Sequence, residues 1–212
     1  MSAPTTPVVD NFNRADGPVG ANWTAIMATS EPLFAIVSNK AVAAAGGSPR
    51  SGYWNPTTFG GTTDCWVIWD AGHGAGAPER DVWVRANTFN ATTPPNAGYV
   101  LVIVSGFVTI YKADGIGGVT LIANVATVTT SFVGQWLNIT GTTLTAYTTT
   151  DGVAWTQQLT VVDTTFAAAG YIGFEMTGST VAQNADTFGG GNQSGPTAAD
   201  TPFPPAGRGA SW

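Results

Sequence analysis

The chain has 212 residues, of which 43% are hydrophobic and only 9% are charged, and its formal net charge is −6. This length and apolar content suffice for one all-β domain with a sizeable core. The seven basic residues are scattered, whereas phosphate backbones and anionic membranes are bound through clustered lysine and arginine, so we expect no nucleic acid partner. The longest apolar run, residues 99–104, is the length of a strand, and we therefore expect no membrane insertion. Cys65 is the only cysteine, which excludes an intramolecular disulfide.

Apolar and polar residues alternate along almost the whole chain, and this period of two predicts short β-strands. The expected strands are 8–13, 23–28, 33–38, 40–44, 52–55, 65–70, 81–87, 98–104, 107–112, 119–124, 136–140, 144–149, 155–161, 171–176 and 183–188. Turn dipeptides such as Asp114-Gly115 and Asp151-Gly152 separate several of them and are typical of hairpins. Many short strands at regular spacing indicate a sandwich or barrel, and we expect no helix longer than one turn.

Two similar tripeptides stand near the ends of this strand region. Asp10-Asn11-Phe12 and Asp186-Thr187-Phe188 each place an acid two residues before a phenylalanine, at the edge of a turn-rich segment. We predict that the first and last strands lie side by side, with both phenylalanines in one core. Residues 8–190 would then form one closed domain, preceded by an N-terminal extension at 1–7.

The segment 191–212 has a different composition from the rest of the chain. It is rich in proline and glycine and carries two late aromatic residues, Phe203 and Trp212. Such a segment cannot form a core, so it is either disordered or an extended arm on a neighbouring protein, with the two aromatic side chains as anchors. We favour the arm, which implies a partner protein and a homo-oligomer within a larger assembly.

The expected strand 81–87 carries the clearest candidate site. Alternation places four side chains on one face and the intervening valines and alanine on the other; the four are Asp81, Trp83, Arg85 and Asn87. An aromatic ring flanked by polar groups suits a sugar, because the ring packs on the C–H face of a pyranose and the polar groups bind its hydroxyls. The more common explanation of such a strand is a solvated face with an Asp81–Arg85 pair, on which Trp83 only packs beneath a loop, and the glycan site is the hypothesis set against it.

Calcium is the one cofactor that the sequence admits. If the two tripeptides are adjacent, Asp10 and Asp186 could share a calcium ion with carbonyl oxygens of the turn at 16–17. We favour the alternative, in which no cofactor is bound and each aspartate accepts hydrogen bonds from nearby backbone N–H groups in an Asx-turn.

Several stretches of the chain resemble a known family. They are DNFNRADGPVGANW (10–23), GYVLVIVSGFVTIYK (98–112), QWLNITGTTL (135–144), and GYIGFEM and DTFGGG near the end. The chain resembles the concanavalin A-like lectin/glucanase sandwich, and within it the laminin-G-like domains of tailed-phage virion proteins, above all minor tail proteins of actinobacteriophages. The resemblance covers about residues 8–190 and implies an antiparallel jelly-roll sandwich of two curved sheets, to which the arm at 191–212 is added.

The same resemblance implies a function and a location. We expect a non-enzymatic virion structural protein, made in the host cytoplasm, that is a minor tail or surface-exposed component contacting host surface glycan. Its arm would contact other virion proteins. The alternatives are a capsid decoration protein, a free carbohydrate-binding module and a glycoside hydrolase.

Glycoside hydrolysis is the least favoured of these hypotheses. Glucanases of the family use three alternating carboxylates on one strand, and only Glu79 and Asp81 have this spacing here, with no third acid at Trp83 or Val84. His73 is the single histidine and has no nucleophile motif near it. We therefore expect no catalytic residues.

Overall fold

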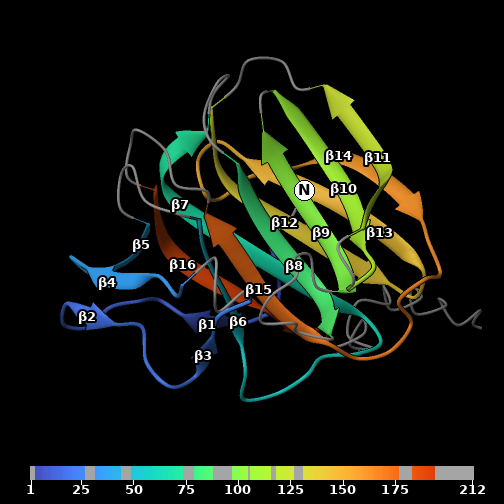
Figure 1. Ribbon diagram of the computed structural model, residues 1–212. Coiled ribbons are helices and arrows are strands. Elements are labelled where there is room, and N and C mark those ends of the chain that lie inside the picture. Colours follow the sequence, from blue (N-terminus) through green and yellow to red (C-terminus); the bar gives the residue numbers. More distant parts are fainter. Residues whose placement is uncertain are drawn as a thin grey trace, which may run out of the picture.

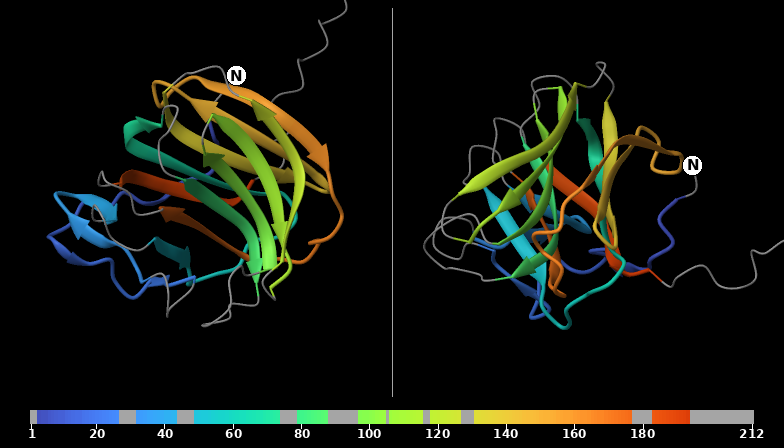
Figure 2. Two further views of the ribbon diagram at one scale, coloured as in Figure 1. Left: turned by 45° about the horizontal axis from the view of Figure 1, so that its top comes forward. Right: turned by 90° about the vertical axis from the view of Figure 1, so that its right-hand side faces the viewer.

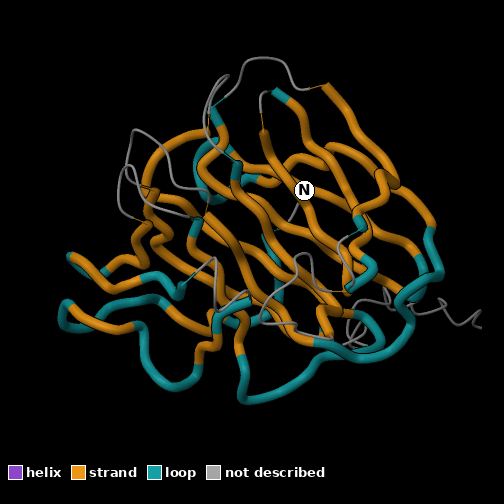
Figure 3. The backbone as a smooth tube through the Cα atoms, in the orientation of Figure 1, coloured by secondary structure: helices purple, strands orange, loops and turns teal. Residues whose placement is uncertain are grey.

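The computed structural model describes residues 3–26, 32–43, 49–73, 79–87, 97–104, 106–115, 118–126, 131–176 and 183–193. Within these ranges the chain forms sixteen β-strands and no helix (Figure 3). It follows that no helix able to cross a membrane occurs in this part of the chain. Each strand expected from the alternation pattern has a counterpart, and the two-residue strand β2 is added to them.

The strands form two antiparallel sheets that face each other (Figures 1 and 2). The nine-stranded sheet has the order β14-β13-β12-β7-β16-β5-β4-β2, with β1 beside β16. Its strands are β1 (Val8–Asp10), β2 (Gly17–Pro18), β4 (Ala35–Val37), β5 (Lys40–Ala43), β7 (Thr63–His73), β12 (Phe132–Thr140), β13 (Thr143–Thr149), β14 (Trp155–Val162) and β16 (Gln183–Asn192). The seven-stranded sheet has the order β11-β10-β9-β8-β15-β6-β3. Its strands are β3 (Trp23–Thr24), β6 (Arg50–Trp54), β8 (Arg80–Asn87), β9 (Ala97–Val104), β10 (Phe107–Ala113), β11 (Val119–Ala126) and β15 (Tyr171–Met176).

The core between the sheets confirms the pairing of the two tripeptides. Strand β1 is antiparallel to β16, and Phe12 and Phe188 are both fully buried in the same cluster. The Trp23 ring lies 6.0 Å from that of Phe12 and 4.8 Å from that of Phe188, so one indole joins both phenylalanines. The first and last strands thus close one β-sandwich, as the sequence predicts.

A β-bulge at Arg85 interrupts β8. The pairing of β8 with β9 shifts register between Val84 and Asn87, and Arg85 has a φ of 51°, in the left-handed region that is uncommon for residues other than glycine. The Arg85 side chain is 3% exposed. Its guanidinium donates hydrogen bonds to the backbone carbonyl oxygens of Gly61, Gly141 and Phe166. One buried side chain therefore holds three separate connections together.

A buried carboxylate connects both ends of the described chain on the outer face of the nine-stranded sheet. Oδ2 of Asp64 accepts hydrogen bonds from the Thr6 hydroxyl at 3.0 Å, the Trp136 indole at 3.1 Å and the Gln193 amide at 3.3 Å. Asp64 is fully buried, and burial raises its pKa to about 6, although the three donors act in the opposite direction. The N-terminal segment and the residue after β16 therefore meet at one acid.

Candidate functional site

The register of the seven-stranded sheet builds a distinctive outer face. Residues directly opposite one another on antiparallel strands share a face, and Tyr111, Val100 and Trp83 form such a row across β10, β9 and β8. The next row passes through Asp81, and there Glu175 of β15 lies directly opposite it. Aromatic and acidic side chains from three strands, β8, β10 and β15, are thus brought together by sheet register rather than by loops.

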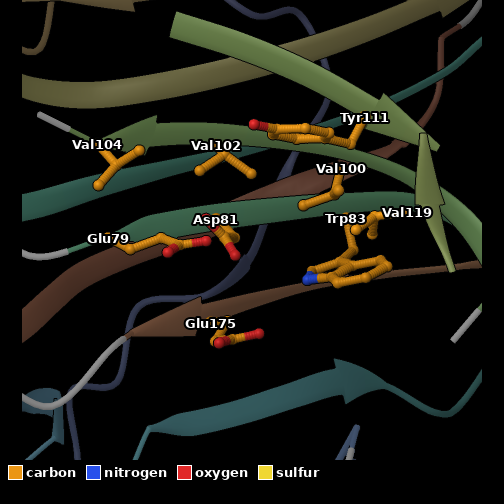
Figure 4. A pocket seen from close by; sticks show the side chains of 9 residues that line it. All are labelled: Glu79, Asp81, Trp83, Val100, Val102, Val104, Tyr111, Val119 and Glu175. Atoms are coloured by element: carbon orange, nitrogen blue, oxygen red, sulfur yellow. The ribbon is translucent and has the colours of Figure 1, made fainter. Parts of the chain in front are cut away.

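These rows line an open groove with a volume of about 350 Å³. Its lining residues are Glu79, Asp81, Trp83, Val100, Val102, Val104, Tyr111, Val119 and Glu175. Figure 4 shows the three acids gathered along one side of the groove, and Trp83, Tyr111 and Val119 along the other. The groove therefore has an acidic side and an aromatic side, and Val100, Val102 and Val104 of the neighbouring strand β9 run alongside both.

The charged residues that line the groove are all acidic. Glu79, Asp81 and Glu175 are acidic, and none of the described residues that line it is basic. Burial raises the pKa of Glu79 above its usual value, and a hydrogen bond with Asp81 partly offsets this effect. A hydrogen bond between two carboxyl groups requires a proton on one of them, so the three acids carry fewer than three full negative charges while this bond is formed. The groove is therefore acidic and partly desolvated.

Trp83 and Tyr111 present different surfaces to the groove. Trp83 is 4% exposed, and its Nε1 is buried without a hydrogen-bond partner among the described atoms. The indole nitrogen lies on the edge of the ring that faces Asp81 and Glu175 (Figure 4). Tyr111 is half-buried, so its ring is the more accessible aromatic surface. The indole therefore offers a hydrogen-bond donor, and the phenol ring offers a stacking surface.

The structure brings together two of the four residues predicted for a glycan site. Asp81 and Trp83 line the groove, whereas Arg85 and Asn87 do not. The predicted alternation is wrong beyond Val84, because the bulge turns Arg85 to the carbonyl oxygens described above and places Ala86 in the cluster of Trp83. Phe203 and Trp212, the predicted anchors of the arm, lie outside the described residues.

Two groove residues escaped sequence reasoning because each comes from another strand. Glu175 is an isolated acid in the apolar segment GYIGFEM, and Tyr111 follows a register shift in the pairing of β10 with β11. An acid within an otherwise apolar strand is a usable signal, since its charge must face solvent or a polar site. The partner strand could not be identified from the sequence, because β8 and β15 are far apart along the chain.

The predicted calcium residues do not fit a cation. Asp10 Oδ1 accepts hydrogen bonds from Arg14 Nη1 and the Phe12 backbone N–H, both at 2.8 Å. Oδ2 accepts from Arg14 Nη2 at 2.9 Å and from Trp23 Nε1 at 2.8 Å. A guanidinium thus occupies the place that a calcium ion would need, and the Asx-turn alternative holds for Asp10. Asp186 is exposed, and across the described ranges no three His, Cys, Asp or Glu residues are placed to hold a metal ion.

We therefore expect Asp10 to stabilise the protein through Arg14 and not through a calcium ion. The difference in Tm between the wild type and Asp10→Asn should be the same in millimolar Ca²⁺ and in excess EDTA, as measured by differential scanning calorimetry. Asp10→Asn should lower the free energy of unfolding by about 1–3 kcal/mol with or without calcium, because the Arg14 guanidinium loses its charged partner. A rise in Tm on adding calcium, absent in Asp10→Asn, would contradict this assignment.

Comparison with known proteins relates the fold to lectins. Neither a family model nor a curated protein matches the sequence. Among solved structures, the carbohydrate binding module CBM66 from Bacillus subtilis has a TM-score of 0.54 at 14% identity, covering 82% of this chain and 95% of that one. The exoplasmic/lumenal domain of VIP36, in its Ca²⁺/Man3GlcNAc-bound form, has a TM-score of 0.60 at 9% identity, covering 84% and 87%. The legume lectin-like domain from Entamoeba histolytica has a TM-score of 0.55 at 13% identity, covering 89% and 100%.

A glycoside hydrolase is also among the similar structures. The GH43 protein BlXynB from Bacillus licheniformis has a TM-score of 0.55 at 12% identity, and the match covers 87% of this chain but only 39% of that one. At such identities these similarities establish the fold alone. The chain is a concanavalin A/legume-lectin-like β-sandwich, which confirms the fold class expected from the sequence. The relation to tailed-phage proteins stays a prediction.

Proposed function

We propose that this chain is a non-enzymatic carbohydrate-binding domain whose ligand occupies the groove on the outer face of the seven-stranded sheet. The observation that carries the proposal is the groove itself, where an accessible tyrosine ring and a row of valines lie beside three acidic side chains. Sugars need this combination, because their C–H faces pack on apolar surface while their hydroxyls donate to oxygen acceptors. The carbohydrate binding module CBM66 and the glycan-bound VIP36 domain support the proposal by analogy of fold.

Tyr111→Ala provides the direct test of this proposal. We expect it to weaken binding of the best ligand from a glycan array about tenfold, which corresponds to about 1.4 kcal/mol, because the stacking surface is lost. The measurement is isothermal titration calorimetry on protein with an unchanged circular dichroism spectrum. Tyr147→Ala is the matched control, since Tyr147 is also half-buried but stacks on Trp136 at 4.3 Å, on the outer face of the other sheet. Equal losses of affinity in both variants, or no glycan bound at all, would contradict the proposal.

We propose further that the domain is a surface-exposed component of a tailed-phage virion, either a minor tail protein or a capsid decoration protein. The sequence resemblance and the composition of 191–212 support this assignment, and host surface glycan would be the ligand. Gln193 leaves the sandwich on the face opposite the groove, so a neighbouring virion protein bound by the segment that follows would leave the groove accessible. The test is co-sedimentation with phage particles. A protein that stays monomeric and shows no affinity for particles would contradict a virion role and favour a free carbohydrate-binding module.

Glycoside hydrolysis is the second candidate, and one observation favours it. The third carboxylate that β8 lacks is supplied by Glu175, directly opposite Asp81 on the neighbouring strand. If the groove hydrolyses a polysaccharide, Glu79→Gln and Asp81→Asn should each abolish release of reducing sugar. Activity that is absent in the wild type, or that both variants retain at the wild-type level, leaves binding as the function of the groove.

A further inference from the structure

From the chemistry of the groove we infer that it selects uncharged glycans and rejects acidic ones, with a sugar hydroxyl bound between the Trp83 indole N–H and the carboxylates of Asp81 and Glu175. This inference rests on the proposed function of the groove and adds the class of sugar that it binds. Two independent observations support this inference. One is that the charged lining residues are all acidic, and the other is that the Trp83 indole N–H is buried without a hydrogen-bond partner among the described atoms.

The charge of the groove determines which sugars can enter. Glu79, Asp81 and Glu175 line one side, and none of the described lining residues is basic. A uronic or sialic acid would bring its carboxylate next to these acids, where partial desolvation strengthens the repulsion. The acidic side therefore disfavours anionic sugars, whereas hydroxyl groups can donate hydrogen bonds to it.

The indole N–H of Trp83 determines what the bound group must offer. Trp83 is 4% exposed, and its Nε1 has no hydrogen-bond partner among the described atoms. A buried donor without an acceptor is unfavourable, so a ligand that supplies an oxygen acceptor gains more here than at an exposed donor. The donor faces the carboxylates (Figure 4), so the bound group must accept from the indole and donate to an acid.

A hydroxyl group meets both requirements, and a charged group does not. The hydroxyl has one donor hydrogen and two acceptor lone pairs, whereas an ammonium group only donates and a carboxylate only accepts. Asp81 and Trp83 are two residues apart on β8, which places their backbones about 7 Å apart on the same face of the sheet. One sugar residue can therefore reach both side chains.

The experiment compares sugars that differ in charge and little else. A glycan array of the full chain at pH 7 would identify a neutral ligand, and calorimetry would then compare that ligand with its uronic or sialic acid derivative. N-acetylated and deacetylated chitotriose form a second pair that differs by positive charge. We expect the acidic derivative to bind at least tenfold more weakly than the neutral ligand. This difference in affinity should decrease as the salt concentration increases, because salt screens the repulsion between the ligand and the acidic residues.

Two variants separate the charge from the hydrogen bond. Glu175→Gln keeps the size of the side chain and removes its charge. We therefore expect the ratio of the affinities for the neutral and the acidic ligand to decrease several-fold. Asp70→Asn is the control, because Asp70 is exposed, lies in β7 of the other sheet and is paired with Lys40, and it should leave this ratio unchanged. Trp83→Phe keeps an aromatic ring but removes the indole N–H together with part of the bicyclic ring, and we expect about fivefold weaker binding of the neutral ligand. The salt series on the wild type tests the charge effect even if a variant fails to fold.

The outcomes distinguish this inference from the proposed function. Equal binding of neutral and acidic ligands would overturn the selectivity but leave a carbohydrate-binding groove. Tighter binding of deacetylated than of acetylated chitotriose would show that a cation is preferred, and would overturn the assignment of a neutral hydroxyl. If the affinity of Trp83→Phe for the neutral ligand is unchanged, the indole N–H does not bind the ligand. Absence of binding to any glycan by a folded protein would instead overturn the proposed function itself.

Discussion

Arg85→Ala is expected to lower the free energy of unfolding by about 3–5 kcal/mol, because it removes a buried charged donor from three backbone carbonyl oxygens. The guanidinium is 2.7 Å from the carbonyl oxygen of Phe166 and 3.2 Å from that of Gly141, and it also donates to that of Gly61. The variant would leave these acceptors unsatisfied around a cavity. Since small domains are stable by about 5–15 kcal/mol, the loss would be a large fraction of the total. Urea denaturation followed by tryptophan fluorescence measures it.

Arg50→Ala is the matched control for this prediction. Arg50 is only half-buried, and it donates to the carbonyl oxygen of Leu33 at 3.3 Å, so we expect a loss of less than about 1 kcal/mol. Arg85→Met separates the two causes of the effect, because methionine fills most of the space but cannot donate. If Arg85→Met is as stable as the wild type, the three hydrogen bonds are not what stabilises the loops.

Asp64→Asn is expected to stabilise the protein at neutral pH by up to roughly 3 kcal/mol. The pKa of Asp64 is raised from 3.8 to about 6 in the folded protein, and each unit corresponds to about 1.4 kcal/mol. A raised carboxyl pKa means that the folded state binds the proton more tightly than the unfolded state. The contribution of Asp64 is therefore most favourable below pH 3.8 and is lost as the pH rises toward about 6. Asparagine avoids this loss, and its side-chain oxygen can accept from the same donors.

The measurement is the difference in unfolding free energy between Asp64→Asn and the wild type at several pH values from 3.5 to 7. We expect this difference to be near zero at the acid end and to increase up to about pH 6. Asp163→Asn is the control with the opposite sign. Burial raises the pKa of the Asp163 carboxyl, but hydrogen bonds outweigh this effect and hold the pKa well below its usual range. The donors are the hydroxyl and the backbone N–H of Thr165, the Tyr99 hydroxyl at 2.7 Å and Lys112 at 3.1 Å. Replacement of Asp163 should destabilise the protein throughout the range from pH 5 to 7. A pH-independent difference for Asp64→Asn would show that the buried carboxylate does not titrate near pH 6.

Much of the fold follows from the sequence because strand formation here is governed by local alternation. The period of two identifies every strand except β2, where Gly17 and Pro18 have the composition of a turn and form a strand only by pairing with β4. The closure of the sandwich also follows, since the two Asp-x-Phe tripeptides place Phe12 and Phe188 in one core. These predictions depend on which side chains must be buried, and burial can be read from the pattern.

The site is less predictable because it depends on register between distant strands. Strand β8 pairs with β15, more than eighty residues later, so no local signal brings Glu175 beside Asp81. The bulge at Arg85 could not be predicted from the sequence either. It requires a left-handed backbone conformation, which residues other than glycine rarely adopt, and carbonyl oxygens from three distant connections. Alternation therefore predicts the face of Asp81 and Trp83 correctly and fails two residues further along the same strand.

The position of Asp64 determines from which face of the sandwich the protein can be linked to a surface or to another protein. Thr6 and Gln193 both bind this acid, so the described chain enters and leaves the sandwich side by side, on the outer face of the nine-stranded sheet (Figure 2). The groove lies on the outer face of the other sheet. A linkage made through the residues before Thr6 or after Gln193 therefore starts from the face opposite the groove.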